Sequence, residues 1–575
     1  MFLRRRPLAL TVSLAFSARL CRTMASKTIP VLPHAELSDG QMKEVAFGDG
    51  KVLLSRIGDD IHATSAFCTH YGAPLAKGVL TADGRVVCPW HGACFNVCTG
   101  DIEDAPGPSP IHSFRTSVKD GQIHVTADPT YTTAAGKSRA PKVSTTVEEG
   151  GPGVVIVGGG SGAYGVVESL REFGYRKPVT IISTEGHGPI DRTKLSKALI
   201  SDPAKLELRT PADLKIKYGA SLRTSSTVTS VDTSNRTVSI GGKEQIAYES
   251  LILATGGIPR RLPIDGADAD NVFVLRSVED VKKIDAACTE GKKLVVIGSS
   301  FISMELVAAV SKRKLASIDV IGMEEFPFEA VLGKAIGAGL KKYHESQGVT
   351  FHPSTSVSAI RHKQGEPSEV DLQSGKTLQA DAVVMGVGVR PATDFLKESG
   401  WTLERDGSVR VDEYLRVRGK ESGVYAIGDI ATYPQLTTGV ERRVEHWNVA
   451  ANHGRAVGKT IAGLSAGRKE DMQPFVKVPV FWSAQGQQLR YCGVGAGYDD
   501  IIIQGDPNEM KFVAYYLQAG KVVAVASMQN DPLVMKASEL LRLGLMPTAD
   551  EIRGGKDVLQ IDIATSSAIG RLTDK

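Results

Sequence analysis

The chain has 575 residues, of which 42% are hydrophobic and 23% charged, an ordinary composition for a folded protein of three or four domains. Its seven cysteines are too few for a secreted disulfide scaffold and suit a reducing compartment. Six of the 68 basic residues lie within the first 27 positions, and the other 62 are balanced by 64 acidic residues. The net charge of +4 therefore belongs to the N-terminus, and no nucleic-acid partner is expected.

Residues 1–27 are predicted to be a targeting leader. The segment is free of acids and contains Ser and Thr, a composition typical of a mitochondrial presequence. The alternative is a secretory signal with Pro7–Ala18 as its apolar core, but basic residues follow that core directly. A start at Met24 would leave a cytoplasmic form. Beyond the leader, no run of 18 or more apolar residues predicts a membrane span. The basic residues of the leader are Arg4, Arg5, Arg6, Arg19, Arg22 and Lys27.

Two short cysteine–histidine pairs come next, Cys68-Thr-His70 and Cys88-Pro-Trp-His91. Two thiolates on one iron and two imidazoles on the other form the ligand set of a Rieske 2Fe–2S cluster. A structural zinc site is the alternative, although its usual order is Cys-x-x-Cys followed by His-x-x-x-His. The pattern favours the cluster, with Cys68, His70, Cys88 and His91 as the metal ligands.

The stretch Cys-Thr-His-Tyr-Gly-Ala … Cys-Pro-Trp-His-Gly-Ala-Cys-Phe-Asn resembles the Rieske ferredoxin family over residues 30–127. High-potential members carry an extra cysteine in each loop, and Ala73 and Trp90 stand at those positions here. Ala93 and Phe95 lack hydroxyls that would hydrogen-bond the cluster sulfurs. The resemblance therefore implies a low-potential cluster. Cys94 and Cys98 are expected to be bystanders, with redox-sensitive thiols as the alternative.

Short β-like runs such as Lys51–Ile57, Ile61–Thr64 and Ile123–Val125 alternate with turns. They predict a small all-β domain with the two cluster loops at one tip. Residues 128–152 are rich in Thr, Ser, Pro, Gly and Ala and lack apolar periodicity, which predicts a linker. We expect this linker to be flexible enough for the β domain to swing.

After the linker, strand–helix alternation begins with the apolar run Val154–Val157. Gly158 and Gly160, with Ala163 in the third place, match the dinucleotide fingerprint G-x-G-x-x-[G/A]. The first glycine permits the tight turn, the second lets a pyrophosphate approach the backbone, and the third residue keeps helix and strand close. The next strand leads to Glu185, a candidate acceptor for a ribose hydroxyl.

A second, weaker fingerprint follows the strand Leu294–Ile297, with Gly298 in the first position and Ser300 in place of a glycine. Two such units predict two bound dinucleotides. The following strand leads to Glu324, which favours a free ribose hydroxyl over a 2′-phosphate. No arginine lies in Ile321–Ala330, so NADH is favoured, although Lys312, Arg313 and Lys314 leave NADPH open.

An apolar strand that ends in Ala254-Thr255-Gly256, together with Asp429 after a later strand, completes a recognisable order of segments. Residues 153–575 resemble the FAD-dependent pyridine-nucleotide reductases of the glutathione-reductase fold. The resemblance implies FAD at 153–273 and 391–473, NAD(P)H at the inserted 274–390, and a C-terminal α+β domain at 474–575.

The segment Asp-Arg-Thr-Lys-Leu-Ser-Lys, residues 191–197, resembles the flavin segment of the apoptosis-inducing-factor and ferredoxin-reductase branch of that family. The alternative for its Arg192 and Lys197 is an ordinary solvated charged loop. A Rieske domain in front of the reductase resembles the Rieske-containing type of that branch. The cofactor-binding residues expected from these fingerprints and resemblances are Gly158, Gly160, Ala163, Thr184, Glu185, Arg192, Lys197, Val228, Ala254, Thr255, Gly256, Arg260, Gly298, Ser300, Glu324, Gly428, Asp429, Glu445, His446 and Trp482.

Beyond Cys98 only Cys288 and Cys492 remain, far apart in the sequence. A Cys-x-x-Cys relay at the flavin is therefore excluded, and both cysteines are expected to be buried packing residues. The spacing of histidines does not predict a mononuclear iron site.

The predicted fold is a small all-β Rieske domain followed by an α/β flavoprotein with two dinucleotide-binding domains and an α+β C-terminal domain. The predicted function is an FAD-dependent oxidoreductase that passes electrons from NADH, or NADPH, through FAD to the 2Fe–2S cluster and on to an unidentified acceptor. No catalytic side chain is expected. The expected partners are the pyridine nucleotide, an unidentified electron acceptor for which a protein is one candidate, and a second copy of the chain in a dimer. The alternatives are a signalling effector in apoptosis that uses this fold as a redox-sensitive binding platform, and the reductase component of a separate oxygenase.

Overall fold

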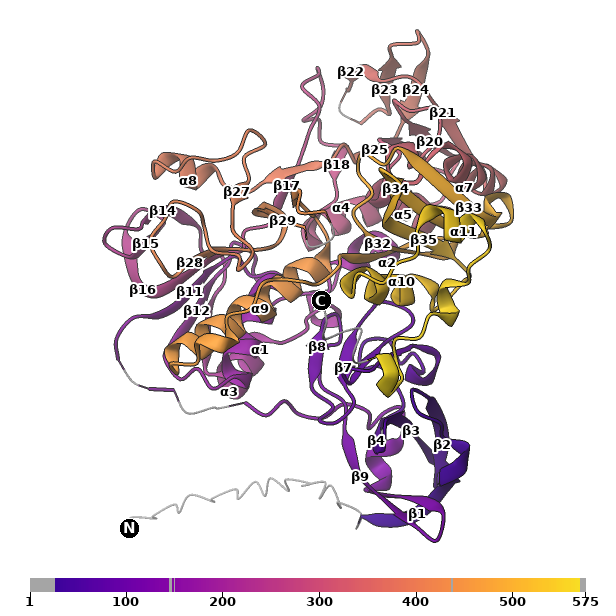
Figure 1. Cartoon of the computed structure of the whole chain (residues 1–575). Coiled ribbons are helices and arrows are strands. Elements are labelled where there is room, and N and C mark those ends of the chain that lie inside the picture. Colours follow the sequence, from indigo (N-terminus) through magenta and orange to yellow (C-terminus); the bar gives the residue numbers. More distant parts are fainter. Residues whose placement is uncertain (1–25, 144–146, 149, 364, 436–437, 569–575) are drawn as a thin grey trace, which may run out of the picture.

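The computed structural model describes residues 26–143, 147–148, 150–363, 365–435 and 438–568 (Figure 1). The basic residues at 4–22 and the alternative start Met24 lie outside this part, so the predicted leader does too. Lys27, which we expected to close the leader, is the first residue of a strand. Among the described residues, no helix is long and apolar enough to cross a membrane.

The N-terminal domain consists of two antiparallel sheets. The strand runs expected from the sequence are present, each within one or two residues of its predicted bounds. The order of the larger sheet is β1-β10-β9-β4-β3-β2, and β5-β6-β7-β8 forms the smaller sheet that carries the second cysteine–histidine loop. The strands are β1 (Lys27–Pro33), β2 (Met42–Phe47), β3 (Gly50–Ile57), β4 (Asp60–Ser65), β5 (Val79–Thr81), β6 (Arg85–Val87), β7 (Cys94–Asn96), β8 (Ile102–Asp104), β9 (Ser113–Lys119) and β10 (Gln122–Ala127).

The first α/β unit is a parallel sheet, β13-β12-β11-β16-β28, extended by the antiparallel strands β15 and β14. Helices α1 and α9 pack against each other on one face of this sheet (Figure 1). The elements are β11 (Gly153–Val157), α1 (Ser161–Glu172), β12 (Val179–Ile182), α2 (Thr193–Ala198), α3 (Pro211–Tyr218), β13 (Ala220–Arg223), β14 (Val228–Asp232), β15 (Thr237–Ile240), β16 (Glu244–Leu253), α8 (Asp394–Glu398), β28 (Val424–Ala426) and α9 (Trp447–Ser465).

The second α/β unit repeats this plan with the parallel order β18-β25-β19-β20-β21 and the antiparallel meander β22-β23-β24. The chain leaves the first unit along β17 (Gly257–Pro259) and returns along its antiparallel partner β26 (Val389–Pro391), so the second unit is an insertion. Its elements are β18 (Val272–Val274), α4 (Val278–Ala287), β19 (Lys293–Ile297), α5 (Phe301–Val310), β20 (Ser317–Ile321), α6 (Glu329–Leu332), α7 (Lys334–Ser346), β21 (Val349–His352), β22 (Val357–Arg361), β23 (Ser368–Leu372), β24 (Thr377–Ala380) and β25 (Ala382–Met385).

The C-terminal part is an antiparallel sheet in the order β31-β32-β35-β34-β33, followed by two helices. A small sheet, β27-β29-β30, lies in the chain before it. The elements are β27 (Val409–Arg410), β29 (Ala431–Pro434), β30 (Glu441–Arg443), β31 (Val480–Gln485), β32 (Gln487–Gly493), β33 (Asp500–Asp506), β34 (Lys511–Gln518), β35 (Lys521–Met528), α10 (Leu533–Arg542) and α11 (Ala549–Arg553).

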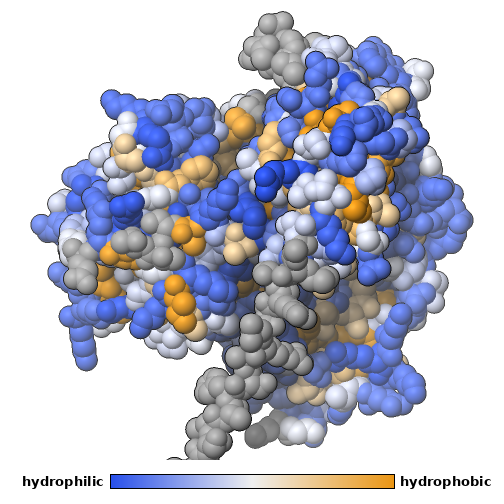
Figure 2. All heavy atoms as spheres, turned by 90° about the horizontal axis from the view of Figure 1, so that it is seen from below, coloured by the Kyte–Doolittle hydropathy of each residue, from blue (hydrophilic) through white to orange (hydrophobic). Residues whose placement is uncertain are grey.

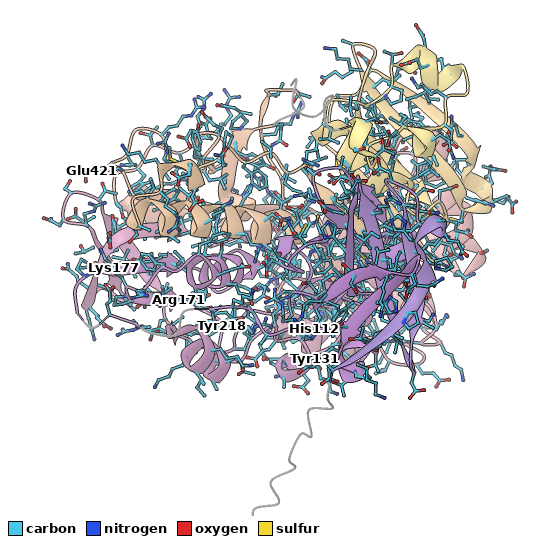
Figure 3. All side chains as sticks on the ribbon, turned by 60° about the horizontal axis from the view of Figure 1, so that its bottom comes forward. His112, Tyr131, Arg171, Lys177, Tyr218 and Glu421 are labelled. Carbon is cyan, nitrogen blue, oxygen red and sulfur yellow. The ribbon has the colours of Figure 1, made fainter. Side chains whose placement is uncertain are left out.

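The segment expected to be a free linker is partly structured. Its first residues form a 3-10 helix, Pro129–Thr132, and the ring of Tyr131 stacks on His112 with 4.2 Å between ring centroids (Figure 3). Arg139 forms an ion pair with Asp101 of the β domain. The prediction of a free tether is therefore wrong for the first half of the segment, which belongs to the β domain.

The β domain also packs firmly against the rest of the chain. Val87 of β6 shares a hydrophobic core with Val480 of β31 and Met535 of α10. The final described segment returns to the β domain, where the backbone N–H of Ala82 donates to the Ile563 carbonyl at 2.7 Å. In Figure 1 this segment, drawn in yellow, descends beside the indigo strands. These contacts hold the domain docked in this structure, and the swinging motion stays a hypothesis.

A buried ionic cluster lies at this boundary. Lys477 donates to the carboxylate of Asp104 at 2.9 Å, and Arg85 pairs with the same carboxylate. Burial alone would raise the pKa of Asp104, but Lys477 and Arg85 outweigh it and hold the pKa well below its usual range. Seen from below the view of Figure 1, the surface is mainly hydrophilic with separate hydrophobic areas (Figure 2).

Asp104→Asn is expected to lower the free energy of unfolding by about 3 kcal/mol, because it leaves buried Lys477 without its carboxylate and leaves Arg85 with only the more distant Glu103 and Glu539. The measurement is denaturant unfolding at neutral pH. Glu103→Gln is the matched control: the neighbouring side chain is 37% exposed and lies 4.0 Å from Arg85, so its loss should cost below about 1 kcal/mol. Equal losses in the two variants would contradict a special role for Asp104.

The same carboxylate predicts an acid sensitivity. Its pKa is depressed in the folded state, so its stabilising effect is complete above the unfolded pKa of about 3.9 and is lost as the pH falls below that value. The difference between the unfolding curves of wild type and Asp104→Asn should therefore be constant near neutral pH, begin to shrink below about pH 4 and still be present at about pH 3, because the folded-state pKa lies far below the unfolded one.

Candidate functional site

The two cysteine–histidine loops adopt the same backbone conformation. In the first loop the N–H of Cys68 donates to Ala73, and in the second the N–H of Cys88 donates to Ala93. Gly72 and Gly92, which follow the histidines, have φ values of +77° and +72°. This left-handed region strains residues that carry a Cβ, so glycine is required for each loop to turn back.

The four expected ligands converge. Nδ1 of His70 and Nδ1 of His91 lie 3.1 Å apart, and the thiols of Cys68 and Cys88 are hydrogen-bonded to each other. Burial lowers the pKa of His70 to about 4 and that of His91 further, so both imidazoles are neutral, the form that binds a metal. One pair of nitrogens and one pair of sulfurs therefore face a common space.

This geometry fits a binuclear cluster. Among the described residues, no group of three or more His, Cys, Asp or Glu side chains meets at a point that would hold a single metal ion. A tetrahedral zinc site needs four such ligands around one ion, whereas each iron of a Rieske cluster takes only two from the protein. The alternative of structural zinc is therefore not supported.

A cavity of about 1090 Å³ lies between the two α/β units and the C-terminal sheet. Sixteen of the twenty expected cofactor-binding residues line it, although they come from segments far apart in the sequence. They are Gly158, Gly160, Thr184, Glu185, Arg192, Lys197, Val228, Ala254, Thr255, Gly256, Ser300, Gly428, Asp429, Glu445, His446 and Trp482.

Gly160 is the residue that most directly indicates a bound group in the cavity. Its φ of −85° is open to any residue, and an added Cβ would meet no atom of the described chain within 4 Å. Neither backbone strain nor packing explains the glycine, so space for a bound group does. Gly158 differs, because its φ is +114° and a Cβ there would lie 2.2 Å from the carbonyl oxygen of Ala254. The pair fits a pyrophosphate at the start of α1.

The charged residues of the cavity wall are paired with one another. Nη2 of Arg192 donates hydrogen bonds to both carboxylate oxygens of Glu185, at 2.9 and 2.7 Å. Lys197 lies 3.0 Å from Glu305, a buried carboxylate that also accepts hydrogen bonds from Ser196 and Ser483. The solvated-loop alternative for Arg192 and Lys197 is therefore not supported, since both are held in the cavity wall.

Arg276 and Glu305 are among the wall residues that the sequence analysis did not identify. Arg276 donates to Asp429 at 2.9 Å, and Glu305 closes the pair with Lys197. A signal for Glu305 was present: it is the single acid in the otherwise apolar helix Phe301–Val310. No comparable pattern marks Arg276.

Four expected residues lie outside the cavity wall. Ala163 is buried inside α1, and a Cβ on Gly298 would lie 2.4 Å from the Gly386 carbonyl, so both serve close packing. Arg260 donates to the Val389 carbonyl at 3.0 Å. Glu324 is exposed beyond the carboxyl end of β20.

Polar atoms near the start of α9 also fit a bound cofactor. Nδ1 of His446 and Oδ1 of Asn448 are buried and have no hydrogen-bond partner among the described residues. Buried polar groups are normally hydrogen-bonded, and both residues line the cavity. A ring system with polar edges would satisfy them.

Trp482 connects the cavity to the four metal ligands. Its ring forms part of the cavity wall, and its centroid lies 4.5 Å from that of His91 and 5.7 Å from that of His70. On the other side of the loop, Tyr71 donates a 2.9 Å hydrogen bond to Asp191 of the flavin segment. The two sites therefore share a wall one aromatic ring thick.

Cys94, Cys288 and Cys492 are buried, as expected for packing residues. Burial raises the pKa of the Cys288 thiol to about 11 and that of Cys492 to about 12, so both are inert at neutral pH. Cys98 is exposed, with its sulfur 3.6 Å from Nε2 of His62.

Residues 152–454 match the model of the pyridine nucleotide-disulphide oxidoreductase family, residues 27–115 match the Rieske [2Fe-2S] domain, and residues 480–559 match the reductase C-terminal domain. The chain therefore belongs to the pyridine nucleotide-disulphide oxidoreductase family and carries a Rieske domain in front of it.

Among curated relatives, the chain is 38% identical to apoptosis-inducing factor 3 of Mus musculus over 515 residues, which cover 88% of this chain and 83% of that protein. Among solved structures it is similar to the ferredoxin reductase for the CYP199A2 system from Rhodopseudomonas palustris, at 28% identity and a TM-score of 0.63 over 70% of this chain and 97% of that one. The covalent putidaredoxin reductase–putidaredoxin complex also matches, at 25% identity and a TM-score of 0.63 over 68% of this chain and 94% of that one.

The fold and the cofactor set expected from the sequence are confirmed by these matches. The protein is an FAD-dependent oxidoreductase with a 2Fe–2S cluster, and NAD(P)H is its electron donor. Electrons pass through FAD to an acceptor.

Gly160→Ala is expected to weaken FAD binding by about tenfold, or about 1.4 kcal/mol, because the new methyl group occupies the space of the pyrophosphate. Flavin fluorescence during titration of the apoprotein measures the affinity. Gly186→Ala is the matched control, since its Cβ would meet only one atom, 3.8 Å away, and the residue does not line the cavity. Unchanged flavin affinity in Gly160→Ala would contradict the assignment of the pyrophosphate to this turn.

Proposed function

We propose that this protein is an NADH oxidoreductase in which one chain carries the whole path from nicotinamide through FAD to the Rieske cluster. The observation that supports this most directly is Trp482, which lines the flavin cavity and contacts His91 with 4.5 Å between ring centroids. One of the similar solved structures is described as a complex of putidaredoxin reductase with putidaredoxin, and here a Rieske domain and a reductase are parts of one chain.

FAD is assigned to the first α/β unit. Gly158 and Gly160 cradle its pyrophosphate, Glu185 accepts from the ribose, and Asp429 accepts from the ribityl chain. Lys197 of α2, together with Glu445 and His446 of the segment between β30 and α9, would surround the ring system. The support for this assignment is the cavity that gathers these residues and the unexplained openness at Gly160.

The nicotinamide dinucleotide is assigned to the second α/β unit, with Ser300 beside its phosphates. NADH is favoured over NADPH because Glu324 follows β20, where a carboxylate accepts from a free ribose hydroxyl. Of the three nearby cations, Arg313 pairs with Asp285 at 2.7 Å.

Bound FAD supplies the conversion between a two-electron donor and a one-electron acceptor. The chain's own residues position it. The Lys197–Glu305 pair and its two serine hydroxyls form a fixed polar wall in the cavity, and Trp482 closes the side toward the cluster. No side chain is required as acid, base or nucleophile.

Electrons are proposed to leave the cluster at Tyr71. The tyrosine ring stacks on His70 with 3.8 Å between centroids and an interplanar angle of 17°, and the residue is 43% exposed. His91 is only 5% exposed, because Trp482 covers it. The acceptor is proposed to be a protein that docks over Tyr71.

A role in apoptosis rests on the name of the mouse relative alone. Rapid NADH-dependent reduction of ferricyanide or cytochrome c would favour the oxidoreductase over a pure signalling platform. Crosslinking an acceptor in the cell would reveal a separate oxygenase partner. The proposed location is the mitochondrion, supported by the Arg-rich first 27 residues, with a cytoplasmic form from Met24. A dimer stays a prediction, and light scattering would test it by measuring the molar mass in solution.

Trp482→Ala is expected to lower the ratio of cluster-reduction rate to flavin-reduction rate by about tenfold, an added barrier of about 1.4 kcal/mol. The reason is the gap left between the flavin cavity and His91, across which electron transfer is slow. Anaerobic stopped-flow mixing with NADH measures both steps. Trp482→Phe keeps an aromatic ring, so its ratio of cluster-reduction rate to flavin-reduction rate should lie between those of wild type and Trp482→Ala. An unchanged ratio in Trp482→Ala would show that electrons take another route.

Tyr71→Ala is expected to slow reoxidation of the reduced cluster by cytochrome c while NADH still reduces the flavin. Tyr71→Phe is the control: it keeps the ring on His70 and loses only the hydrogen bond to Asp191. If Tyr71→Phe slows reoxidation as much as Tyr71→Ala, the hydrogen bond rather than the exposed ring carries the effect.

A further inference from the structure

Several charged side chains of the reductase part of the chain act on the cluster ligands. Asp191 and Lys194 act on His70, Lys197 and Arg490 act on His91, and Arg490 also acts on Cys88. The Rieske domain itself lacks the hydroxyl groups at Ala93 and Phe95 that would hydrogen-bond the cluster. Charged side chains of the reductase part therefore contribute to the electrostatic potential at the cluster site.

Arg490 is the buried cation among them. It lies in the middle of β32 and is 4% exposed. Trp482 is its direct cross-strand partner on β31, so the two side chains leave the same face of the sheet, and the Trp482 ring contacts His91. Arg490 therefore points to the same side as the cluster ligands.

The guanidinium of Arg490 is incompletely compensated. Nη1 donates to Gln488 at 3.1 Å, but Nε has no hydrogen-bond partner among the described residues and lies 3.6 Å from the Asp531 carboxylate. Asp531 is itself 36% exposed, so water screens its charge. A buried arginine keeps its proton and is costly unless something balances it.

The cluster supplies a charge that changes with its redox state. Two Fe(III), two sulfides, two thiolates and two neutral imidazoles sum to zero, and one added electron makes the total −1. A fixed positive charge nearby stabilises the reduced form more than the oxidised form and so raises the reduction potential.

We propose that the buried charge of Arg490 raises the reduction potential of the Rieske cluster, so that the cluster accepts electrons from the flavin more readily in the docked arrangement. By linkage, reduction of the cluster must strengthen docking by the same free energy that docking adds to reduction. This inference rests on the proposed cluster site.

The test is a potentiometric titration of the full-length holoprotein, monitored by the electron paramagnetic resonance signal of the reduced cluster. Arg490→Gln is expected to lower the ratio of reduced to oxidised cluster at a fixed potential by about tenfold, which is about 59 mV for one electron. Arg490→Lys should recover part of the shift, because it restores the charge without the fork geometry.

Asp531→Asn is the decisive partner variant, since it removes the negative charge that opposes Arg490 and should raise the potential. Structural damage would not shift the two variants in opposite directions. Arg553→Gln, an exposed arginine of the same domain that pairs with Asp500, should leave the potential unchanged.

An Arg490→Gln protein with stoichiometric iron and sulfide and an unchanged potential would overturn the inference. A shift of Asp531→Asn in the same direction as Arg490→Gln would do the same. If Arg490→Gln fails to hold the cluster, Arg490→Lys and Asp531→Asn decide between these outcomes. A wild-type protein without iron and sulfide would instead refute the proposed function itself.

Discussion

The structure depends on the contact between the ring of Trp482 and His91, because it places a metal site against a flavin cavity. Everything around that contact serves to hold it. The buried Asp104–Lys477 pair joins the Rieske domain to the segment before β31, and the last described residues return to hydrogen-bond Ala82. A shared hydrophobic core seals the same boundary. Docking is thus built from burial, charge and chain connection together.

This arrangement has a cost, since the histidine edge of the cluster is turned inward. An external acceptor cannot reach His91, and the exposed ring next to the cluster ligands is Tyr71. This placement supports the proposal that electrons enter and leave the cluster on different sides of the loop. Some of the charges that act on the ligands come from the reductase, which supports the proposal that the redox properties of the cluster depend on docking.

The sequence predicted the parts well and their assembly poorly. The sequence identifies Gly158, Gly160 and the two cysteine–histidine pairs, because their chemistry requires a fixed spacing between residues that are close in sequence. Arg276, Glu305 and Arg490 act on sites that are distant in sequence, and no local pattern marks a side chain that becomes important only through tertiary packing. The linker shows the opposite error: its composition indicates a free tether, but stacking of Tyr131 on His112 and the Arg139–Asp101 pair anchor it.

The most direct measurement of electron transfer within one docked chain is the concentration dependence of cluster reduction after anaerobic mixing with NADH. The account predicts a first-order rate constant that stays the same over a wide dilution of the protein, because donor and acceptor sites share one wall. A rate that rises in proportion to protein concentration would mean that electrons pass between molecules, and it would contradict the docked arrangement as the working state.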